Sequence, residues 1–427
     1  MERPVVAIGR DAVVQLSERL GEPQWLREQR LRAWEVFEAT PMPQMTDEEW
    51  RRTDIRRLDL GSFNIPQEPA QSYQPETSQD HRSGFMQIVD GFTVDLQMES
   101  ELAEKGVIFA SLSEAAAQHP ELVQKYLGQL IPAEYGKFAS LAAAFATGVF
   151  VYVPVGVEVE LPLMVSFTLT QGGSVVFPRT LLVAERHSSV TLIDRYYSET
   201  SENAALSVGA IEVFAGEGSQ VRYVNVQEWG RNVWNFVVER HHVERDAQEN
   251  NLNIALGGRF SKANNEAVLA GPGANCEMLG LTFGDEEQFF DAHTLQDHAA
   301  PSCFSDLLYK GVLRDTSRSV FSGLIRVRPG SQKTDAYQTN RNLLLSDSSR
   351  ADSIPNLEIE ANDVKCSHGA SVGPIDQDQL FYLMARGLSK RDAERLIVDG
   401  FFQPLVNRIP LEGVRERLQA AIDEKMD

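Results

Sequence analysis

The hydrophobic pattern divides the chain into a helical start, a long middle rich in expected strands and a helical end. Between Pro23 and Thr40 apolar residues recur at helical intervals, and two prolines directly after this segment stop the helix. A polar stretch rich in Pro, Gln and Ser follows and predicts a flexible connector near residues 61–85. Short helical patterns then resume, so residues 1–146 are expected to form an N-terminal helical region.

Residues 147–373 carry a different pattern. Short segments rich in Val, Ile, Phe and Tyr follow one another, often with apolar and polar residues alternating, and turns that contain glycine separate them. Such alternation is typical of half-buried strands. A propeller would show a repeat with blade signatures, and a pair of sandwiches would show a linker, but the sequence has neither. The continuous series of strands therefore favours a β-solenoid, in which each coil stacks on the next.

The helical pattern returns in residues 374–427. The segment that begins at Gln379 ends at Gly387, a typical C-cap, and Ser389 begins the next helix. Apolar residues at helical spacing from Leu411 onward predict a third helix. So short a helical segment cannot build a good core alone. It must dock elsewhere, either as a cap on the last coil or as a module that binds a partner protein.

Composition and charge narrow the classes of function. Of the 427 residues, 42% are hydrophobic and 24% are charged, which is typical of a folded globular protein. The 40 Lys and Arg against 61 Asp and Glu give a net charge of −21, most of it in the middle region. Such a surface repels phosphates, so neither nucleic acid nor a lipid membrane is an expected partner. With no apolar run of membrane-spanning length and no secretory signal, a soluble cytoplasmic protein is expected.

The densest group of potential metal ligands is the pair Cys366 and His368. Phosphate loops, HExxH, GxSxG and CxxC motifs are all absent, which argues against the common catalytic classes. If residues 363–369 form a strand, Cys366 and His368 point to the same face, about 6–7 Å apart along it. Thiolate and imidazole suit a soft or borderline metal, but two ligands are half a site, so a second chain or an exogenous sulfide must complete it. The residues alone leave open that Cys366 is simply an inert, half-buried cysteine.

The weaker candidates are isolated thiols, consecutive histidines and charged residues on expected strands. Consecutive histidines face opposite sides of a strand and do not form a pair. The acidic and histidine residues fit the edge of a solenoid better than a metal site, and the cations are expected to be ion-paired. These candidates are Cys276, Cys303, His241, His242, Asp291, His293, Asp297, His298, Lys310 and Arg314.

Several long segments together resemble one protein family. They are EPQWLREQRLRAWEVFEATPMP near the start, then SDLLYKGVLRDTSRSVFSG, NRNLLLSD, LEIEANDVKCSHGA and QLFYLMARGLSKRDAERLIVDGFF. These segments closely resemble the SufB/SufD family of iron–sulfur cluster assembly proteins, and the resemblance extends over nearly the whole chain. The segment Lys365–Ala370 is similar to SufD, whereas SufB chains usually carry a Glu–His pair there.

The resemblance implies a fold, partners and a ligand role. The fold would be mainly β, a right-handed parallel β-helix (β-solenoid) core with α-helical N-terminal and C-terminal domains. The C-terminal helices would dock the ABC-type ATPase SufC, and the last coils would pair with SufB. A transient iron–sulfur cluster would form at that subunit interface, with none tightly bound within the single chain. His368, and less surely Cys366, would be the cluster ligands that this chain contributes.

The resemblance also implies a non-catalytic scaffold, because the ATPase activity resides in the SufC partner. Two alternatives stay open. One is a purely structural subunit with no ligand role, and the other, much weaker, is a β-helix carbohydrate enzyme that works through clustered carboxylates. The sequence also leaves open whether the chain forms a homodimer when SufB is absent.

Overall fold

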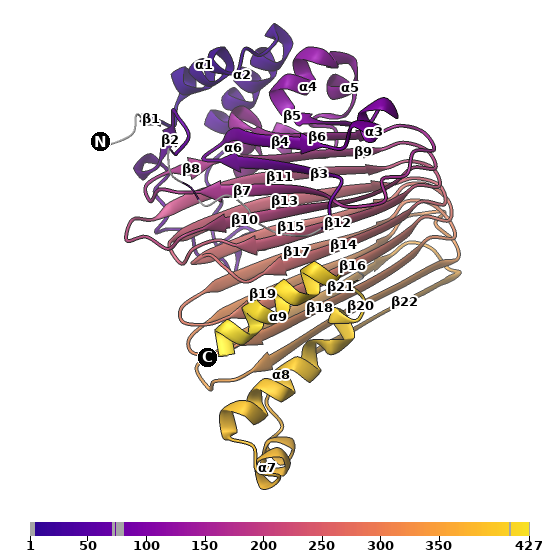
Figure 1. Cartoon of the computed structure of the whole chain (residues 1–427). Coiled ribbons are helices and arrows are strands. Elements are labelled where there is room, and N and C mark those ends of the chain that lie inside the picture. The colour runs from indigo at the N-terminus through magenta and orange to yellow at the C-terminus, as the bar shows by residue number, and fades with distance from the viewer. Residues whose placement is uncertain (1–4, 71–72, 74–80, 410, 427) are drawn as a thin grey trace.

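The computed structural model describes residues 5–70, 73, 81–409 and 411–426. Two ten-stranded sheets face each other and enclose one long interior (Figure 1). Sheet I is formed by β3 (Gly84–Val89), β4 (Phe92–Met98), β7 (Leu163–Leu169), β10 (Ser189–Ser198), β12 (Gln220–Glu228), β14 (Gln248–Ala255), β16 (Asn275–Gly284), β18 (Phe304–Leu313), β20 (Thr334–Leu344) and β22 (Val364–Pro374).

Sheet II supplies the opposite wall. It is formed by β5 (Ile108–Ser111), β6 (Thr147–Val153), β8 (Val175–Val176), β9 (Pro178–Ala184), β11 (Ala205–Ala215), β13 (Val233–Val243), β15 (Phe260–Leu269), β17 (Phe289–His298), β19 (Arg318–Val327) and β21 (Arg350–Ile359). From β9 to β22 successive strands alternate between the two sheets, and each pairs in parallel with the strand two places along the chain. The predicted mainly β fold with a β-solenoid core is confirmed.

Side chains alternate between the interior of the solenoid and its outer walls. On β10 every second residue is buried, and on β16 and β18 both faces are largely buried because helices cover the outer wall. The register stacks Gln220, Gln248, Asn275, Phe304 and Asp335. Their unequal spacing along the chain shows that coil length varies, which explains why the sequence reveals no fixed repeat.

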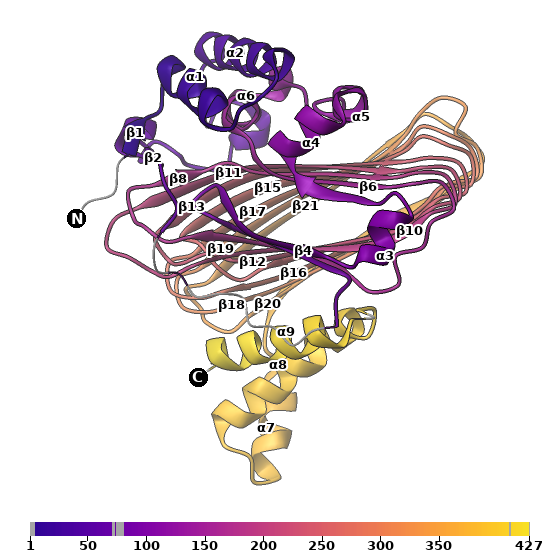
Figure 2. The same ribbon diagram turned by 45° about the horizontal axis from the view of Figure 1, so that its top comes forward.

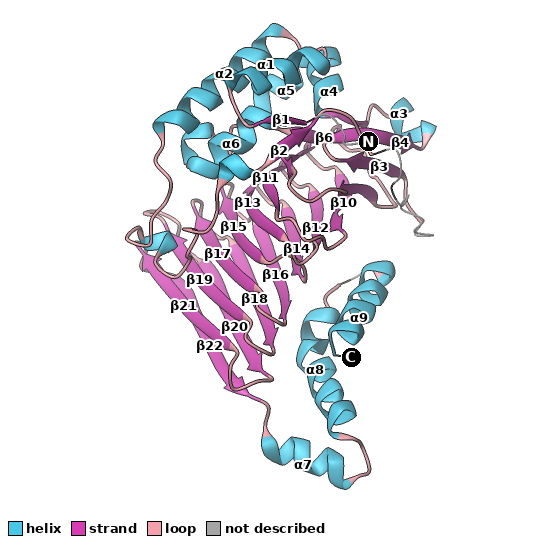
Figure 3. Cartoon of the chain, turned by 90° about the vertical axis from the view of Figure 1, so that its left-hand side faces the viewer, coloured by secondary structure: helices cyan, strands magenta, loops and turns pink. Residues whose placement is uncertain are grey.

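The N-terminal helices cover the outer face of sheet II over its first strands (Figure 3). They are α1 (Arg10–Arg19), α2 (Gln24–Ala39), α4 (Leu112–Gln118), α5 (Pro120–Tyr126) and α6 (Lys137–Phe145), with the short helical turns η1 (Glu48–Trp50), η2 (Leu60–Ser62) and η3 (Ala133–Tyr135) and the paired strands β1 (Val5–Ala7) and β2 (Asn64–Pro66). The short helix α3 (Ser100–Glu104) lies apart from them and packs Leu102 into the interior cluster. Trp34, Phe138 and Phe145 pack on strand residues of sheet II. The predicted helix between Pro23 and Thr40 is confirmed by α2.

The predicted connector near residues 61–85 falls partly outside the described residues, namely at 71–72 and 74–80. The first residues of this predicted connector instead include the strand β2. Ile65 of β2 pairs with Val6 of β1, and the Asn64 amide donates a hydrogen bond to the Gly173 carbonyl of the solenoid.

The C-terminal helices are α7 (Gln377–Ala385), α8 (Lys390–Val406) and α9 (Glu412–Met426). Helices α8 and α9 pack on the outer face of sheet I, while α7 extends away from the solenoid beyond β22 (Figures 1 and 2). The buried residues of this contact on the helix side are Val398, Phe402, Leu405, Ile409, Val414, Leu418, Ile422 and Met426. The helices therefore cover the side of the solenoid and not its last coil.

Within the described part of the chain, every helix is too short or too polar to cross a membrane.

Candidate functional site

Cys366 and His368 lie on β22, the last strand of sheet I. The parallel register places Cys366 beside Ala336 and His368 beside Gln338 on β20. Ala336 and Gln338 are buried in the interior of the solenoid. Because stacked residues in a parallel sheet point to the same face, Cys366 and His368 point inward together. The predicted strand and the predicted shared face are both found.

The last coil leaves its inner face exposed. Strands β21 and β22 end the two sheets, and among the described residues each has a paired strand on one side only. Ile359 and Val372 stack on the interior positions Val327 and Asn342, yet each is 42% exposed. Figure 3 shows this end of the solenoid next to α7 with no helix across it. We call this inner face of β21 and β22 the open end.

The environment of Cys366 disfavours ionisation of its thiol. Its side chain is half-buried against a small apolar cluster that includes Ile325 and Val327. Burial and the nearby Asp335 carboxylate raise the pKa of the Cys366 thiol. Lys365, stacked on Asp335, alternates to the other face of β22. The neutral thiol is therefore the favoured form near pH 7, and a ligand role would require a bound metal to displace its proton.

Cys276 belongs to a charged cluster buried deep in the interior. Its Sγ donates a hydrogen bond to Glu249 Oε2 at 3.0 Å. The His241 ring lies between Glu239 Oε1 and Glu249 Oε1, each at 2.9 Å, and all three side chains are fully buried. Burial opposes a charge on His241, but the two carboxylates outweigh it and raise its pKa to about 10. Burial raises the pKa of the Cys276 thiol well above its usual value.

Sequence reasoning missed Glu239 and Glu249 as partners of His241. Glu239 precedes His241 by two positions on one strand, which is a signal that alternation could have given. Glu249 lies on the opposite sheet, and only the fold brings it near. His242 faces outward, as expected, and its Nε2 lies 3.0 Å from Glu244.

The acidic and histidine group of β17 divides between structural contacts. Asp291 faces outward, accepts hydrogen bonds from Thr53 and from Lys262, and lies 3.1 Å from His293 Nε2. Burial would raise the pKa of Asp291, but Lys262 and His293 outweigh it and lower the pKa to about 2. This network fastens the segment after η1 to the solenoid, which fits the expected structural role.

The rest of that group is structural as well. Asp297 pairs with Arg328 at 2.6 Å. His298 lies inside the solenoid with its Nε2 2.8 Å from Ser305 Oγ, and burial lowers its pKa to about 4, so the ring is neutral. Cys303 is buried and donates to the Gly271 carbonyl oxygen.

The predicted ion pairing is wrong for Lys310 and is confirmed for Arg314, which pairs with Asp315. Lys310 Nζ donates a hydrogen bond to the carbonyl oxygen of Phe401 in α8. Arg314 donates to the carbonyl oxygen of Lys425 in α9 and lies only 3.5 Å from the adjacent Asp315. These cations fasten the C-terminal helices to sheet I. The Lys425 carbonyl is available because carbonyls in the last turn of a helix have no partner within it.

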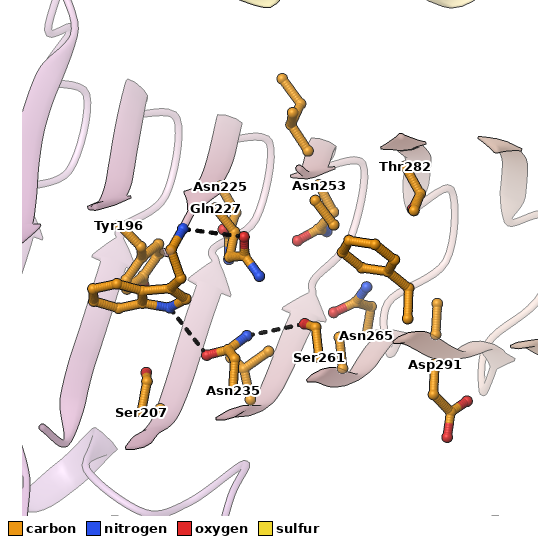
Figure 4. Close-up of a pocket in the computed structure, with 18 of the residues that line it drawn as sticks. Tyr196, Ser207, Asn225, Gln227, Asn235, Asn253, Ser261, Asn265, Thr282 and Asp291 are labelled. Carbon is orange, nitrogen blue, oxygen red and sulfur yellow. Dashed lines mark hydrogen bonds between the residues drawn. The ribbon is translucent and has the colours of Figure 1, made fainter. Parts of the chain in front are cut away.

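An interior cavity of about 50 Å³ lies between the two sheets around Trp229 (Figure 4). Amides and hydroxyls line it, among them Asn235, whose Oδ1 accepts from Trp229 Nε1 at 3.2 Å and whose Nδ2 donates to Ser261 at 3.1 Å. The Asp291 carboxylate points away from the cavity (Figure 4). Apolar side chains such as Val237, Ile254 and Phe290 form the rest of the lining, so an ordered water in this space would bind to the amides and hydroxyls.

Within the described residues, no group of three or more His, Cys, Asp or Glu side chains is arranged to hold a metal ion. The buried cluster around His241 fails because each carboxylate contacts a different ring nitrogen, so its groups do not converge on one point. At the open end, Cys366 and His368 are two potential ligands, fewer than the four of a typical closed site.

Comparison with known proteins adds the family. Residues 167–401 match the family described as "SUF system FeS cluster assembly, SufBD core domain", and residues 17–165 match "SufBD protein N-terminal region". The iron–sulfur cluster assembly protein SufD of Bacillus subtilis (strain 168) is 31% identical over 99% of this chain and 98% of its own length.

Two SufBD family proteins, one from Staphylococcus epidermidis (strain ATCC 12228 / FDA PCI 1200) and one from Staphylococcus haemolyticus (strain JCSC1435), are each 29% identical over 94% of this chain and 89% of their own length. Both family matches follow each other along the chain and together cover most of it. The chain therefore belongs to the SufBD family of iron–sulfur cluster assembly proteins.

Proposed function

We propose that this chain is a SufD-like scaffold subunit of a SUF iron–sulfur cluster assembly complex. In this role it pairs with a SufB-like paralogue, binds a SufC-like ABC ATPase and lends a ligand to a nascent cluster at the SufB–SufD interface. The chain itself is non-catalytic, and ATP hydrolysis belongs to the SufC-like partner. The cytoplasm is the expected compartment, because its reducing conditions keep a thiol such as Cys366 free.

The observation that carries the proposal is the open end of the solenoid. A solenoid normally covers its last coil with a capping element, since the inner face and the free strand edges are otherwise exposed. Here Ile359 and Val372 are exposed apolar side chains on that inner face. A second solenoid of the same architecture is the partner that covers such an end best, which supports pairing with a SufB-like paralogue. A homodimer would use the same surface when the paralogue is absent.

The position of His368 supports the ligand role. Its imidazole is exposed on the inner face of the last coil, so it lies at the boundary between this chain and whatever covers the open end. A half-site at a subunit boundary suits a cluster that must be handed on, because the partner supplies the remaining ligands. His368 is the principal ligand in this proposal, and Cys366 is the secondary one because its thiol is partly buried with a raised pKa.

The ATPase-binding role is supported by an exposed apolar surface on the C-terminal helices. Phe381 is 73% exposed and Tyr382 is 58% exposed, both on α7. Exposed aromatic residues grouped in this way are typical of protein interfaces. Three of the exposed apolar residues lie on α7, one follows it and one lies on α8. They are Phe381, Tyr382, Met384, Leu388 and Leu396.

The ligand role is tested by His368→Ala in the complex with the SufB-like and SufC-like partners. We expect the variant to fold and to assemble with both partners, because the His368 side chain is exposed. We expect cluster formation from iron and sulfide, followed by visible absorption, to be lost. Full cluster formation by His368→Ala together with Cys366→Ala would instead support the purely structural subunit.

The ATPase interface is tested by substitution rather than by truncation. Removing all residues from Gln379 onward would uncover the apolar outer face of sheet I, so a loss of binding could not be interpreted. We expect Phe381→Ser combined with Tyr382→Ser to abolish co-purification of the SufC-like ATPase and to leave SufB-like binding intact. Val155→Ser, an exposed apolar site in a turn of the first coils, is the matched control. Undiminished ATPase binding by the double variant would place that interface elsewhere.

A further inference from the structure

Gln338 is a buried glutamine whose amide has no partner, on the strand beside His368. Its side chain is fully buried. Among the described residues, neither its Oε1 nor its Nε2 has a hydrogen-bond partner. An unpaired buried amide costs free energy, and native proteins keep few of them. The position of Gln338 therefore requires an explanation.

The immediate neighbours of the Gln338 side chain are mostly apolar. The register stacks Gln338 between Leu307 on β18 and His368 on β22. Across the interior its amide lies against Gly323, where a Cβ atom would approach Nε2 to 2.4 Å. Gly323 is itself stacked on Pro355 of the last coil. Of these four neighbours, only His368 has a polar side chain.

The next inward-facing amide on β20 provides a contrast. Asn340 Oδ1 accepts hydrogen bonds from Asn342 Nδ2 at 2.7 Å and from Ser353 Oγ at 2.6 Å. Asn340 Nδ2 donates to the Tyr309 carbonyl oxygen at 3.3 Å. The interior of these last coils can therefore satisfy a buried amide at both of its polar atoms, but neither polar atom of Gln338, which stacks under His368, is satisfied.

We propose that Gln338 is a positioning residue for His368. In the proposed arrangement the Gln338 side chain rotates from the unbonded position that it has in the structure, so that its amide oxygen accepts a hydrogen bond from one ring N–H of His368. The other ring nitrogen is left free to face the open end. A histidine that binds a metal commonly donates its second ring N–H to a carbonyl group, which fixes both tautomer and orientation. The inference rests on the proposed function, in which His368 is a cluster ligand, and it adds a residue that the family resemblance does not assign.

The tautomer of His368 tests this inference without any cluster. The full-length chain is labelled with ¹⁵N-histidine, and the signals of His368 among the eight histidines are identified by their loss in His368→Gln. We expect one dominant tautomer in the wild type. Gln338→Met removes both polar atoms at similar volume and should produce a mixture of tautomers, whereas Gln338→Glu keeps an acceptor oxygen and should restore the single tautomer. Identical ring ¹⁵N shifts in the wild type and Gln338→Met would overturn the inference.

A second measurement separates positioning from a purely structural role. In the complex with the SufB-like partner, Gln338→Met should lower the apparent iron affinity by about 10-fold or more. Gln227→Met, at a buried glutamine that lines the interior cavity on β12, several strands away from β22, is the control and should leave the His368 tautomer unchanged. A lower melting temperature for Gln338→Met with an unchanged tautomer would show a structural role only and would overturn the inference.

Failure of this inference is distinguishable from failure of the proposed function. If His368→Ala abolishes cluster formation while Gln338→Met behaves as the wild type in both measurements, only the role of Gln338 is wrong. If His368→Ala retains full cluster formation while the tautomer still depends on Gln338, the ligand role of His368 is wrong and the hydrogen bond stands.

Discussion

Single buried charges join the N-terminal region to the solenoid. Glu212 on β11 is fully buried and accepts hydrogen bonds from the backbone amides of Gly128, Leu130 and Ile131. Its carboxylate also pairs with the buried Arg179 on β9. One side chain thus satisfies three backbone donors of the segment between α5 and α6 and neutralises a buried guanidinium.

We expect Glu212→Ala to destabilise the protein strongly. The substitution leaves Arg179 buried without its counter-charge and three amides without an acceptor, so the loss should be about 3–5 kcal/mol. Chemical unfolding followed by tryptophan fluorescence measures it. Glu202→Ala, at an exposed site in a turn, is the control and should change stability by less than about 0.5 kcal/mol. Equal stability of both variants would contradict the assigned role of Glu212.

The buried His241 cluster should make stability depend on pH. The folded pKa of about 10 lies above the value of about 6.5 for an unfolded histidine. The stabilisation by the charged ring is therefore fully present below about pH 6.5 and is lost as pH rises through 10. The difference in unfolding free energy between the wild type and His241→Gln should be largest near pH 6 and should shrink steadily toward pH 10. The outward-facing His242→Gln is the control, and a constant difference for His241→Gln would contradict the paired state.

The shared face of Cys366 and His368 could be predicted from alternation on one strand, and the stacking on β20 shows that this face is the inner one. Their exposure could not, because the sequence does not state which coil is last or whether an element covers it. The pairing of His241 with Glu249 on the opposite sheet, and the contacts of Glu212, were also beyond prediction. They depend on how the coils stack, and coil length varies enough that the stacking register cannot be counted along the sequence.

At the scale of elements, the C-terminal helices are fastened to the solenoid by both apolar and charged contacts. Phe402 is buried against Phe283 on β16, with ring centroids 6.5 Å apart. Arg408 contacts Glu277 at 3.0 Å and Asp306 at 2.6 Å on the same wall. The sequence predicted all three helices and indicated that they must dock, but it did not show which sheet they cover. Apolar residues on the outer face of β12 to β18 form the docking surface, and in the sequence they cannot be distinguished from other strand residues.

We expect two phenylalanines of these helices to respond oppositely to truncation. Phe402→Ala removes a buried ring and should lower stability by about 3–5 kcal/mol, because a cavity remains under α8. Phe381→Ala removes a ring that is 73% exposed and should change stability by less than about 0.5 kcal/mol. Hydrogen exchange of α8 and α9 amides should rise in the first variant alone. Equal exchange in both variants would show that the docking does not depend on this contact.

At the scale of the whole molecule, the two ends of the solenoid differ. The first coils are covered by the N-terminal helices, and the last coil leaves its inner face exposed. Sequence patterns gave the architecture in outline, and the family resemblance gave the likeness to SufB/SufD proteins. Only the packing in the structure shows that the C-terminal helices cover the outer face of sheet I and that the last coil is left exposed.

We expect charges at the open end to prevent pairing with the SufB-like paralogue. Ile359→Lys combined with Val372→Lys places two cations on the inner face, where a stacked partner would have to desolvate them. Size-exclusion chromatography with light scattering should show loss of the heterodimer and of any homodimer, with an unchanged melting temperature. Val155→Lys is the control for an added charge at an exposed apolar site. Unaffected pairing in the double variant would place the interface on another surface.

The position of α8 and α9 has a consequence for the order in which the protein is made. A ribosome completes every strand of the solenoid before it reaches Lys390, so the wall that these helices cover is finished while its cover does not yet exist. Leucine, valine and phenylalanine side chains of β12 to β18 face water during that interval, a condition that favours aggregation of nascent chains. Codon changes or temperatures that delay translation of the last helices should therefore lower the soluble yield of this protein, and chaperones that shield apolar surface should restore it.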